Sequence, residues 1–170
     1  VQAAVGQAAR DLATAVGLLK AAGAQYVVVQ NLPDIGKTPL AASQGPQGQA
    51  LFNGLSTLYN STLNAAIGAA NLNVIQFNAY ALATETAANP ALFGFVNATT
   101  PACTTSSSLA CTPSTLVAPN ANTNYVFADG VHPTTGAAIV LSQAIESMIT
   151  GPQQMAALGQ APLDVERANW

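Results

Sequence analysis

The chain has 170 residues, the size of one ordinary domain. Half of them are apolar and only 6% are charged, where average globular domains have roughly 25%. Four basic residues against seven acidic ones leave a net charge of −3. This balance excludes a nucleic-acid binder that neutralises phosphates and a polybasic membrane-surface module, because both need clustered positive charge. The apolar content also argues against disorder, since disordered chains are poor in apolar residues.

The first elements along the chain are predicted to be a helix and a strand. Residues 3–21 carry apolar side chains at helical spacing, and Gly23 is a typical stop signal. Residues 25–30 (QYVVVQ) form a β-branched run without alternation. This run predicts a strand that is buried on both faces, as in a parallel sheet.

A shaped loop separates this strand from the next helix. Residues 31–39 (NLPDIGKTP) are rich in proline and glycine, and Asp34 within them is predicted to form a turn. Residues 41–49 are polar and contain Gly and Pro, which predicts a surface connection. Residues 51–70 predict a second amphipathic helix, and residues 73–78 (NVIQFN) predict a second short strand.

The last part of the chain is predicted to hold one more strand and one more helix. Residues 97–123 have the composition of a loop, and residues 125–128 (YVFA) are short, apolar and strand-like. Thr134 or Thr135 is predicted to cap a final helix that runs to about Met148.

The order of these elements, with a brief helix predicted at residues 80–88, is typical of an α/β protein with a parallel sheet. A few short strands do not make a buried parallel sheet, however. The edges of a buried strand need neighbours, or their N–H and C=O groups stay unpaired. The pattern therefore indicates the second half of a domain rather than a whole one.

The two cysteines, Cys103 and Cys111, stand in the polar segment CTTSSSLAC. They are poor material for a metal site, because the chain has no other cysteine and only one histidine. A local disulfide is favoured, since low charge and abundant uncharged polar residues are typical of exported proteins, in which disulfides persist. Two free buried thiols are the alternative.

The one histidine, His132, follows Asp129 by three positions. An Asp at this spacing can fold back in a tight turn, so that its carboxylate accepts a hydrogen bond from one imidazole nitrogen and leaves the other free as a general base. Gly130 is expected to give the turn its freedom. Two other interpretations stay open: a turn-forming Asp beside an incidental surface histidine, and a metal site on these two residues.

Several segments resemble the GDSL (SGNH) hydrolases. FADGVHPTTGA (residues 127–137) is similar to the C-terminal block in which Asp and His complete a Ser-His-Asp triad, and residues 31–39 resemble the loop after the fourth strand. AAGA at residues 21–24 and FGFVN at residues 93–97 are similar to segments of the secreted and autotransporter-type branch. That branch also carries a cysteine pair before the Asp-x-x-His block.

This resemblance implies a three-layer, flavodoxin-like SGNH-hydrolase fold with a parallel sheet, of which this chain supplies the C-terminal part. Residues 1–150 would form that part of one domain, and residues 151–170 a C-terminal tail or the start of a linker. The resemblance further implies an esterase or lipase without a cofactor, with Asp129 and His132 as catalytic residues.

The chain departs from the family at the nucleophile. Neither a Gly-Asp-Ser block nor the Gly and Gly-x-Asn-Asp blocks of the oxyanion hole are present, and Ser106, Ser107 and Ser108 are loop residues in the cysteine segment. We therefore expect the serine to come from an N-terminal half, either a separate chain or another part of the same protein. This chain alone would be inactive.

The expected substrate is an ester or a lipid, with no nucleic-acid partner. The expected location is secreted, periplasmic or at the cell surface, with linkage to an outer membrane left open. An alternative function is a catalytically inactive SGNH-like module with a binding or structural role. The metal site on Asp129 and His132 is disfavoured, because no further histidine or cysteine ligand is available.

Overall fold

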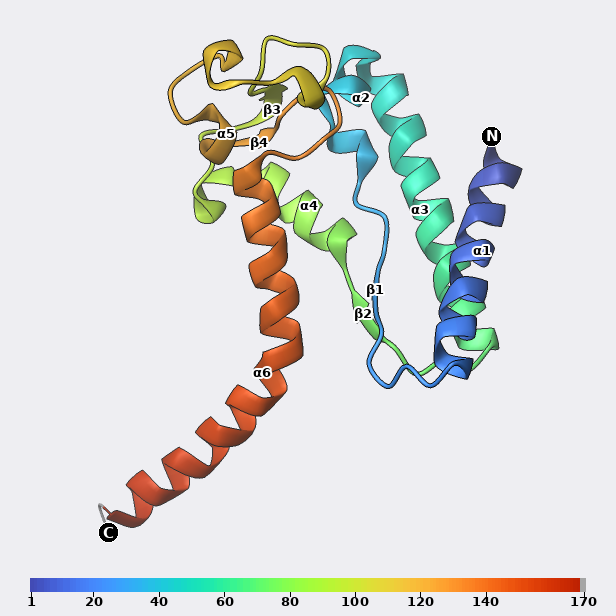
Figure 1. The fold of residues 1–170 in the computed structure, drawn as a ribbon, viewed down its shortest axis with the longest axis vertical. Coiled ribbons are helices and arrows are strands. Elements are labelled where there is room, and N and C mark those ends of the chain that lie inside the picture. Colours follow the sequence, from blue (N-terminus) through green and yellow to red (C-terminus); the bar gives the residue numbers. More distant parts are fainter. Residues whose placement is uncertain (169–170) are drawn as a thin grey trace.

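The protein was analysed as a computed structural model that describes the backbone of residues 1–168 and the side chains of residues 1–151. It is an α/β structure with parallel strands, as predicted (Figure 1). Two long helices lie along one side, two short strands lie beside them, and a looped region caps one end above the last helix. None of the helices in the described part of the chain combines the length and apolar content that a bilayer crossing needs.

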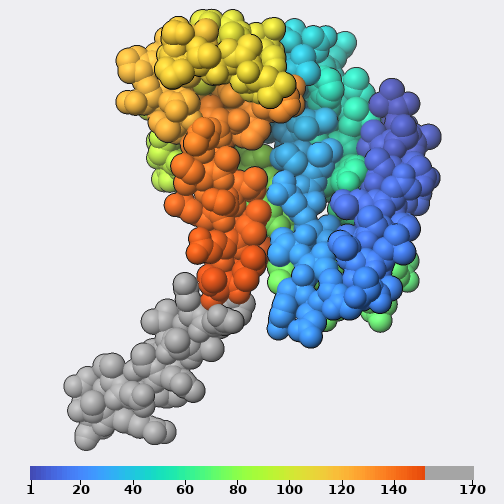
Figure 2. All heavy atoms as spheres, viewed as in Figure 1, coloured from blue at the N-terminus to red at the C-terminus, as the bar shows by residue number. Residues whose placement is uncertain are grey.

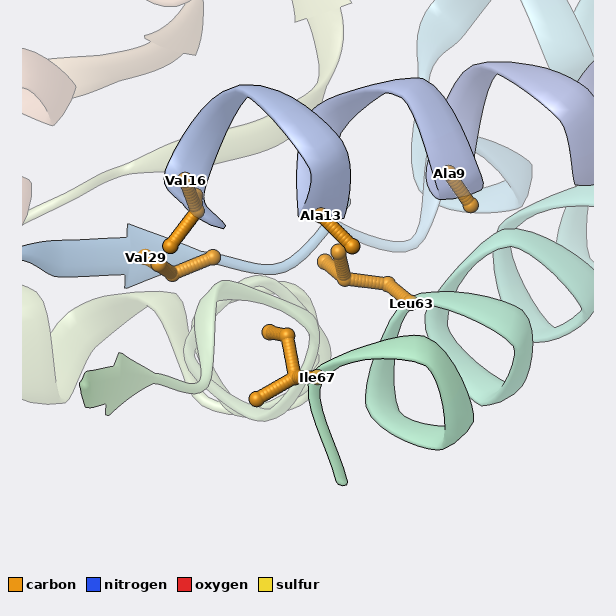
Figure 3. Packing of buried hydrophobic residues seen from close by; sticks show 6 residues of the cluster. All are labelled: Ala9, Ala13, Val16, Val29, Leu63 and Ile67. Carbon is orange, nitrogen blue, oxygen red and sulfur yellow. The ribbon is translucent and has the colours of Figure 1, made fainter. Parts of the chain in front are cut away.

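The helical layer consists of α1 (Gln2–Ala21) and α3 (Gly45–Ala69). They pack against each other and against the first strand, and Figure 3 shows the buried side chains at this contact. The cluster comprises Ala9, Ala13, Val16, Val29, Leu63 and Ile67. Alanines on α1 allow the two helices to approach closely, while Leu63 and Ile67 share one face of α3 because they stand four residues apart.

The strands β1 (Val28–Gln30) and β2 (Ile75–Phe77) pair in parallel, with Val29 opposite Gln76. The prediction that the first strand is buried on both faces was wrong. Val29 is buried against α1 and α3, but Val28 is 37% exposed and Tyr26 is 84% exposed. Alternate side chains of a strand point to opposite faces, and the two helices cover only the face of Val29.

The segment at residues 41–49 lies mostly at the surface, as predicted, but it is largely helical rather than a connection. Helix α2 (Pro39–Ser43) is followed after one residue by α3. Thr38 caps α2 by accepting a hydrogen bond from the backbone N–H of Ala41 (3.2 Å). The prolines at residues 39 and 46 stand in the first turns of α2 and α3, where a missing N–H leaves no helical bond unmade.

The looped region contains a second parallel pair, β3 (Asn97–Pro101) with β4 (Tyr125–Phe127). Residues 97–123 are therefore not all loop, because they hold β3 and the short helix α5 (Ala121–Asn124). The remaining helix before this region is α4 (Ala79–Ala88). Short 3₁₀ turns lie at Ile35–Lys37, Pro90–Phe93, Ser108–Ala110 and Pro113–Thr115. In Figure 2 the segment near residues 100–115 (yellow) covers the end of the molecule above the start of the last helix (orange).

The last helix, α6 (Thr135–Ala168), begins where predicted and continues further than predicted. Thr134 Oγ1 accepts a hydrogen bond from the N–H of Ala137 (3.2 Å), which decides between the two threonines proposed as its cap. The helix does not end near Met148 but continues to Ala168, although Pro152 and Pro162 lie within it. Residues 169–170 of the predicted tail lie outside the described residues.

Candidate active site

The Asp129–His132 segment forms a tight turn directly after β4. Asp129 Oδ1 accepts hydrogen bonds from the backbone N–H groups of Val131 (2.9 Å) and His132 (2.8 Å). The N–H of Ala128 donates to the His132 carbonyl (2.8 Å), and the N–H of Thr134 donates to the Val126 carbonyl (2.9 Å). The chain thus returns alongside β4, and the turn places the histidine beside its own aspartate.

The carboxylate contacts the imidazole within this turn. His132 Nδ1 lies 2.9 Å from Asp129 Oδ2 and 3.0 Å from Oδ1. The aspartate side chain is 5% exposed, whereas the histidine side chain is 66% exposed. A carboxylate can only accept hydrogen bonds, so Nδ1 carries the proton in the neutral ring and Nε2 is the acceptor on the exposed side.

The same contacts set the charge of the aspartate. Burial by itself raises the pKa of Asp129, but the backbone N–H groups of His132, Val131 and Ser108 and the imidazole of His132 all lower it. The hydrogen bonds outweigh burial, and the pKa lies well below the usual range of an aspartate. Asp129 is therefore a carboxylate at neutral pH, as an imidazole-orienting group must be.

We expect this depressed pKa to make stability depend on pH. Above the unfolded-state value of about 4, Asp129 is ionised in both states and its stabilisation is complete. As the pH falls toward the lower folded-state pKa, the unfolded chain takes up the proton first, so stability is lost. The difference in unfolding free energy between wild type and Asp129→Asn should therefore narrow from about pH 6 to about pH 3. Denaturant titrations at both pH values measure it, and the exposed Asp11→Asn is the control. A constant difference would contradict the assignment.

The cysteine pair forms the predicted local disulfide, so the free-thiol alternative is wrong. The disulfide closes the loop that holds Ser106, Ser107 and Ser108. Ser108 contacts the site through its backbone, because its N–H donates to Asp129 Oδ2 (2.7 Å). The sequence analysis did not identify this contact, since every residue except proline has an N–H and no side-chain pattern marks this one.

Asp34 lies at the start of a 3₁₀ turn, as the turn prediction required. It is buried, its Oδ1 accepts from the N–H of Gly36 (2.9 Å), and its Oδ2 accepts from the side-chain amide of Asn53 (2.9 Å). Gly36 is required here, because a Cβ at this position would stand 2.6 Å from the backbone oxygen of Gln49 on α3. Asp34 thus fixes the 31–39 loop to α3.

Helix α2, which follows this loop, contacts the Asp-x-x-His turn. The N–H of Leu40, at the start of α2, donates to the carbonyl of Gly130 (2.9 Å), which lies inside the turn. Gly130 is not among the glycines with a positive φ, which are Gly23, Gly45 and Gly94. The turn therefore does not use the left-handed conformations that glycine favours, and the hydrogen bonds to Asp129 Oδ1 shape it.

Metal ligation was the remaining alternative for this pair. Within the part of the chain that the structure describes, no group of three or more His, Cys, Asp or Glu side chains could hold a metal ion. The pair also does not line the hollow of about 600 Å³ between α3 and the strands, whose walls include Asn60, Asn64 and Phe77. The geometry of the pair is that of an orienting carboxylate and an exposed base.

Comparison with known proteins places this chain in a family. The chain matches the GDSL-like lipase/acylhydrolase family over residues 1–145. It belongs to that family. The sequence resemblance to GDSL hydrolases is thereby confirmed, and the α/β structure with parallel strands is consistent with an SGNH-like fold.

Named relatives support the same assignment. The chain is 35% identical to esterase EstA of Pseudomonas aeruginosa and of Pseudomonas putida over 139 residues, which cover 79% of this chain and 21% of each relative. It is 30% identical to the GDSL esterase/lipase APG of Arabidopsis thaliana over 148 residues, covering 79% of this chain and 42% of that protein. The chain therefore spans less than half the length of these curated relatives.

Proposed function

We propose that the protein is a serine-dependent acyl-ester hydrolase in which this chain supplies Asp129 and His132. The serine and the oxyanion hole come from an N-terminal half, which is a second chain or another part of the same protein. The observation that carries this proposal is the 2.9 Å contact between Asp129 Oδ2 and His132 Nδ1 in a chain of the GDSL-like lipase/acylhydrolase family. The names of the relatives, esterase and esterase/lipase, support the reaction class.

In this mechanism His132 moves protons and Asp129 does not. Nε2 takes the proton of the serine hydroxyl as the serine oxygen attacks the acyl carbon, and the imidazolium then gives that proton to the leaving alcohol. Water next attacks the acyl-enzyme, His132 accepts its proton, and the proton returns to the serine as the acid leaves. Asp129 stays ionised, keeps the ring oriented and stabilises the imidazolium.

The open edge of the small sheet supports the N-terminal half as a partner. In the described structure β1 pairs with β2 along one edge only. The backbone N–H and C=O groups on its other edge have no neighbouring strand to pair with. Tyr26, just before β1, and Val28, within it, are exposed. Leu18, near the end of α1, is exposed as well. A further parallel strand from the N-terminal half would pair with β1 along this edge, and other parts of that half would cover these apolar side chains.

The expected location is an oxidising compartment, so that the protein is secreted, periplasmic or at the cell surface. The disulfide between Cys103 and Cys111 supports this location, because disulfides seldom persist in a reducing cytosol. The low charge of the chain, 6%, is a second supporting feature.

Labelling with a fluorophosphonate probe and turnover of a short-chain nitrophenyl ester test the proposal together. We expect the whole protein to hydrolyse the ester and to carry the label on a serine outside residues 1–170. The isolated chain should do neither. A label on one of this chain's own serines would contradict the division of the triad. A whole protein with neither label nor turnover would favour the inactive binding or structural module.

A further inference from the structure

The two oxygens of the Asp129 carboxylate are held by different parts of the fold. Oδ1 accepts from the N–H groups of Val131 and His132, which belong to the turn itself. Oδ2 accepts from the N–H of Ser108 (2.7 Å), which is 21 residues away in the chain. His132 Nδ1 lies within hydrogen-bond distance of both oxygens, 2.9 Å from Oδ2 and 3.0 Å from Oδ1. The turn therefore fixes Oδ1, the distant N–H of Ser108 fixes Oδ2, and the imidazole contacts both oxygens.

Ser108 reaches this oxygen through a closed ring of contacts. The N–H of Cys103 donates to the carbonyl of Ala128 (3.1 Å), the residue before Asp129. Cys103 is buried and is joined by the disulfide to Cys111. The N–H of Cys111 donates in turn to the carbonyl of Ser108 (3.1 Å). The ring closes where the N–H of Ser108 meets Asp129.

Little else holds the tip of this loop. Among the described residues, the hydrogen bond from Ser108 to Asp129 is the one that joins residues 105–110 to the chain outside the 103–111 loop. Leu109, at the tip, is 97% exposed and so contributes no packing. Apart from its own hydrogen bond and the partial burial of Thr105, Ser107 and Ser108, the loop is held by the covalent link between Cys103 and Cys111.

We propose that the backbone N–H of Ser108, held in place by the Cys103–Cys111 disulfide, is a positioning group that fixes Asp129 Oδ2 toward His132. The inference rests on the proposed esterase function and goes beyond it, because it assigns a catalytic purpose to the disulfide loop. The Ser108 hydroxyl has no part in it. Without this N–H, Oδ2 loses its fixed position, and the imidazole keeps only the contact with Oδ1, which the N–H groups of Val131 and His132 already share.

Proline at position 108 removes the N–H with little other change. Ser108 is the first residue of the 3₁₀ turn Ser108–Ala110, a position that tolerates proline. The preceding Ser107 has φ −132° and ψ 133°, the extended conformation that a following proline requires. The carbonyl of residue 108 can still accept from Cys111. Ser108→Ala is the matched control, since it removes the hydroxyl and keeps the N–H.

In the whole protein, we expect Ser108→Pro to lower kcat for nitrophenyl ester hydrolysis by about 10- to 100-fold with KM nearly unchanged, because a misaligned base loses rate rather than substrate binding. Ser108→Ala should keep the wild-type kcat. The Nδ1–H proton signal of His132 in NMR spectra, assigned by its loss in His132→Ala, should shift in Ser108→Pro and not in Ser108→Ala. Equal kcat and equal spectra for the two variants would overturn the inference.

The double variant Cys103→Ala/Cys111→Ala tests the role of the disulfide and covers the case in which Ser108→Pro does not fold. We expect a similar loss of kcat and a similar change in the His132 signal. Adding Ser108→Pro to this background should give little further loss, because both changes act on one contact. The proposed link between the disulfide and the Ser108 N–H would be overturned if the losses of kcat from Ser108→Pro and from the cysteine double variant multiplied. It would also be overturned if the cysteine double variant kept the wild-type kcat. Failure of the proposed function is a different result, in which His132→Ala hydrolyses the ester as fast as wild type.

Discussion

Replacing Asp129 with asparagine is expected to lower kcat for ester hydrolysis by the whole protein by about 10⁴-fold. The carboxylate accepts from three backbone N–H groups and from His132 Nδ1. Both oxygens of the aspartate accept hydrogen bonds, but an asparagine amide has only one acceptor oxygen. Its NH₂ group must therefore face N–H donors that bonded to the second oxygen. An NH₂ group that faces Nδ1 makes this nitrogen the acceptor and puts the proton on Nε2, which then cannot accept the proton of the serine.

Steady-state kinetics with a short-chain nitrophenyl ester measure this loss. His132→Ala should lose at least as much activity, and the double variant Asp129→Asn/His132→Ala should lose little more, because the two residues act as a unit. Asp11→Asn is the matched control, since Asp11 is an exposed carboxylate on α1 that accepts only from Gln7 among the described residues. An Asp129→Asn variant with wild-type kcat would remove the basis of the proposed mechanism.

The largest expected effect on stability comes from Gly136→Ala. Gly136 lies in the first turn of α6, where a Cβ would overlap the backbone carbonyl oxygen of Thr123 and stand 2.7 Å from its carbonyl carbon. These are main-chain atoms of α5, which cannot move aside as the end of a side chain can. Overpacking of this kind destabilises a fold by about 1–3 kcal/mol, and occasionally by more.

Gly54→Ala is the matched control for this change. Gly54 lies inside α3, and nothing stands within 4 Å of the position of its Cβ. Alanine should therefore stabilise the helix there by up to about 1 kcal/mol. Denaturant unfolding of the two variants should give shifts of opposite sign. An equal, small shift for both would mean that α6 does not pack against α5 at Gly136.

The disulfide loop and the start of helix α2 support the Asp129–His132 turn from two directions. Ser108 donates to the Asp129 carboxylate, and Leu40 donates to the Gly130 carbonyl between the two catalytic candidates. The buried Asp34 holds the second support in place through Gly36 and Asn53. A turn of four residues is thus fixed by segments about 20 and 90 positions away, which is the kind of outer support that keeps a catalytic base in register.

The sequence by itself determined the parts of the protein that depend on short-range interactions. Asp129 and His132 meet within one turn, so a spacing of three residues was enough to predict their contact. The Cys103–Cys111 disulfide and helix α1 were also predicted correctly, because both depend on residues close together in the sequence. Membership of the GDSL-like family also followed from short motifs, and the comparison confirmed it.

Only the tertiary structure decided the long-range contacts. The sequence of residues 25–30 predicts a strand buried on both faces. Burial depends on what covers each face, however, and α1 and α3 cover only one face of this strand. Residues 41–49 can be largely helical because Pro39 and Pro46 fall in first turns, where proline is tolerated. The N–H of Ser108 has no signature in sequence, because its partner is chosen by the path of the chain and not by the side chain. Local chemistry specifies the Asp–His pair, and the folded chain supplies the contacts that orient it.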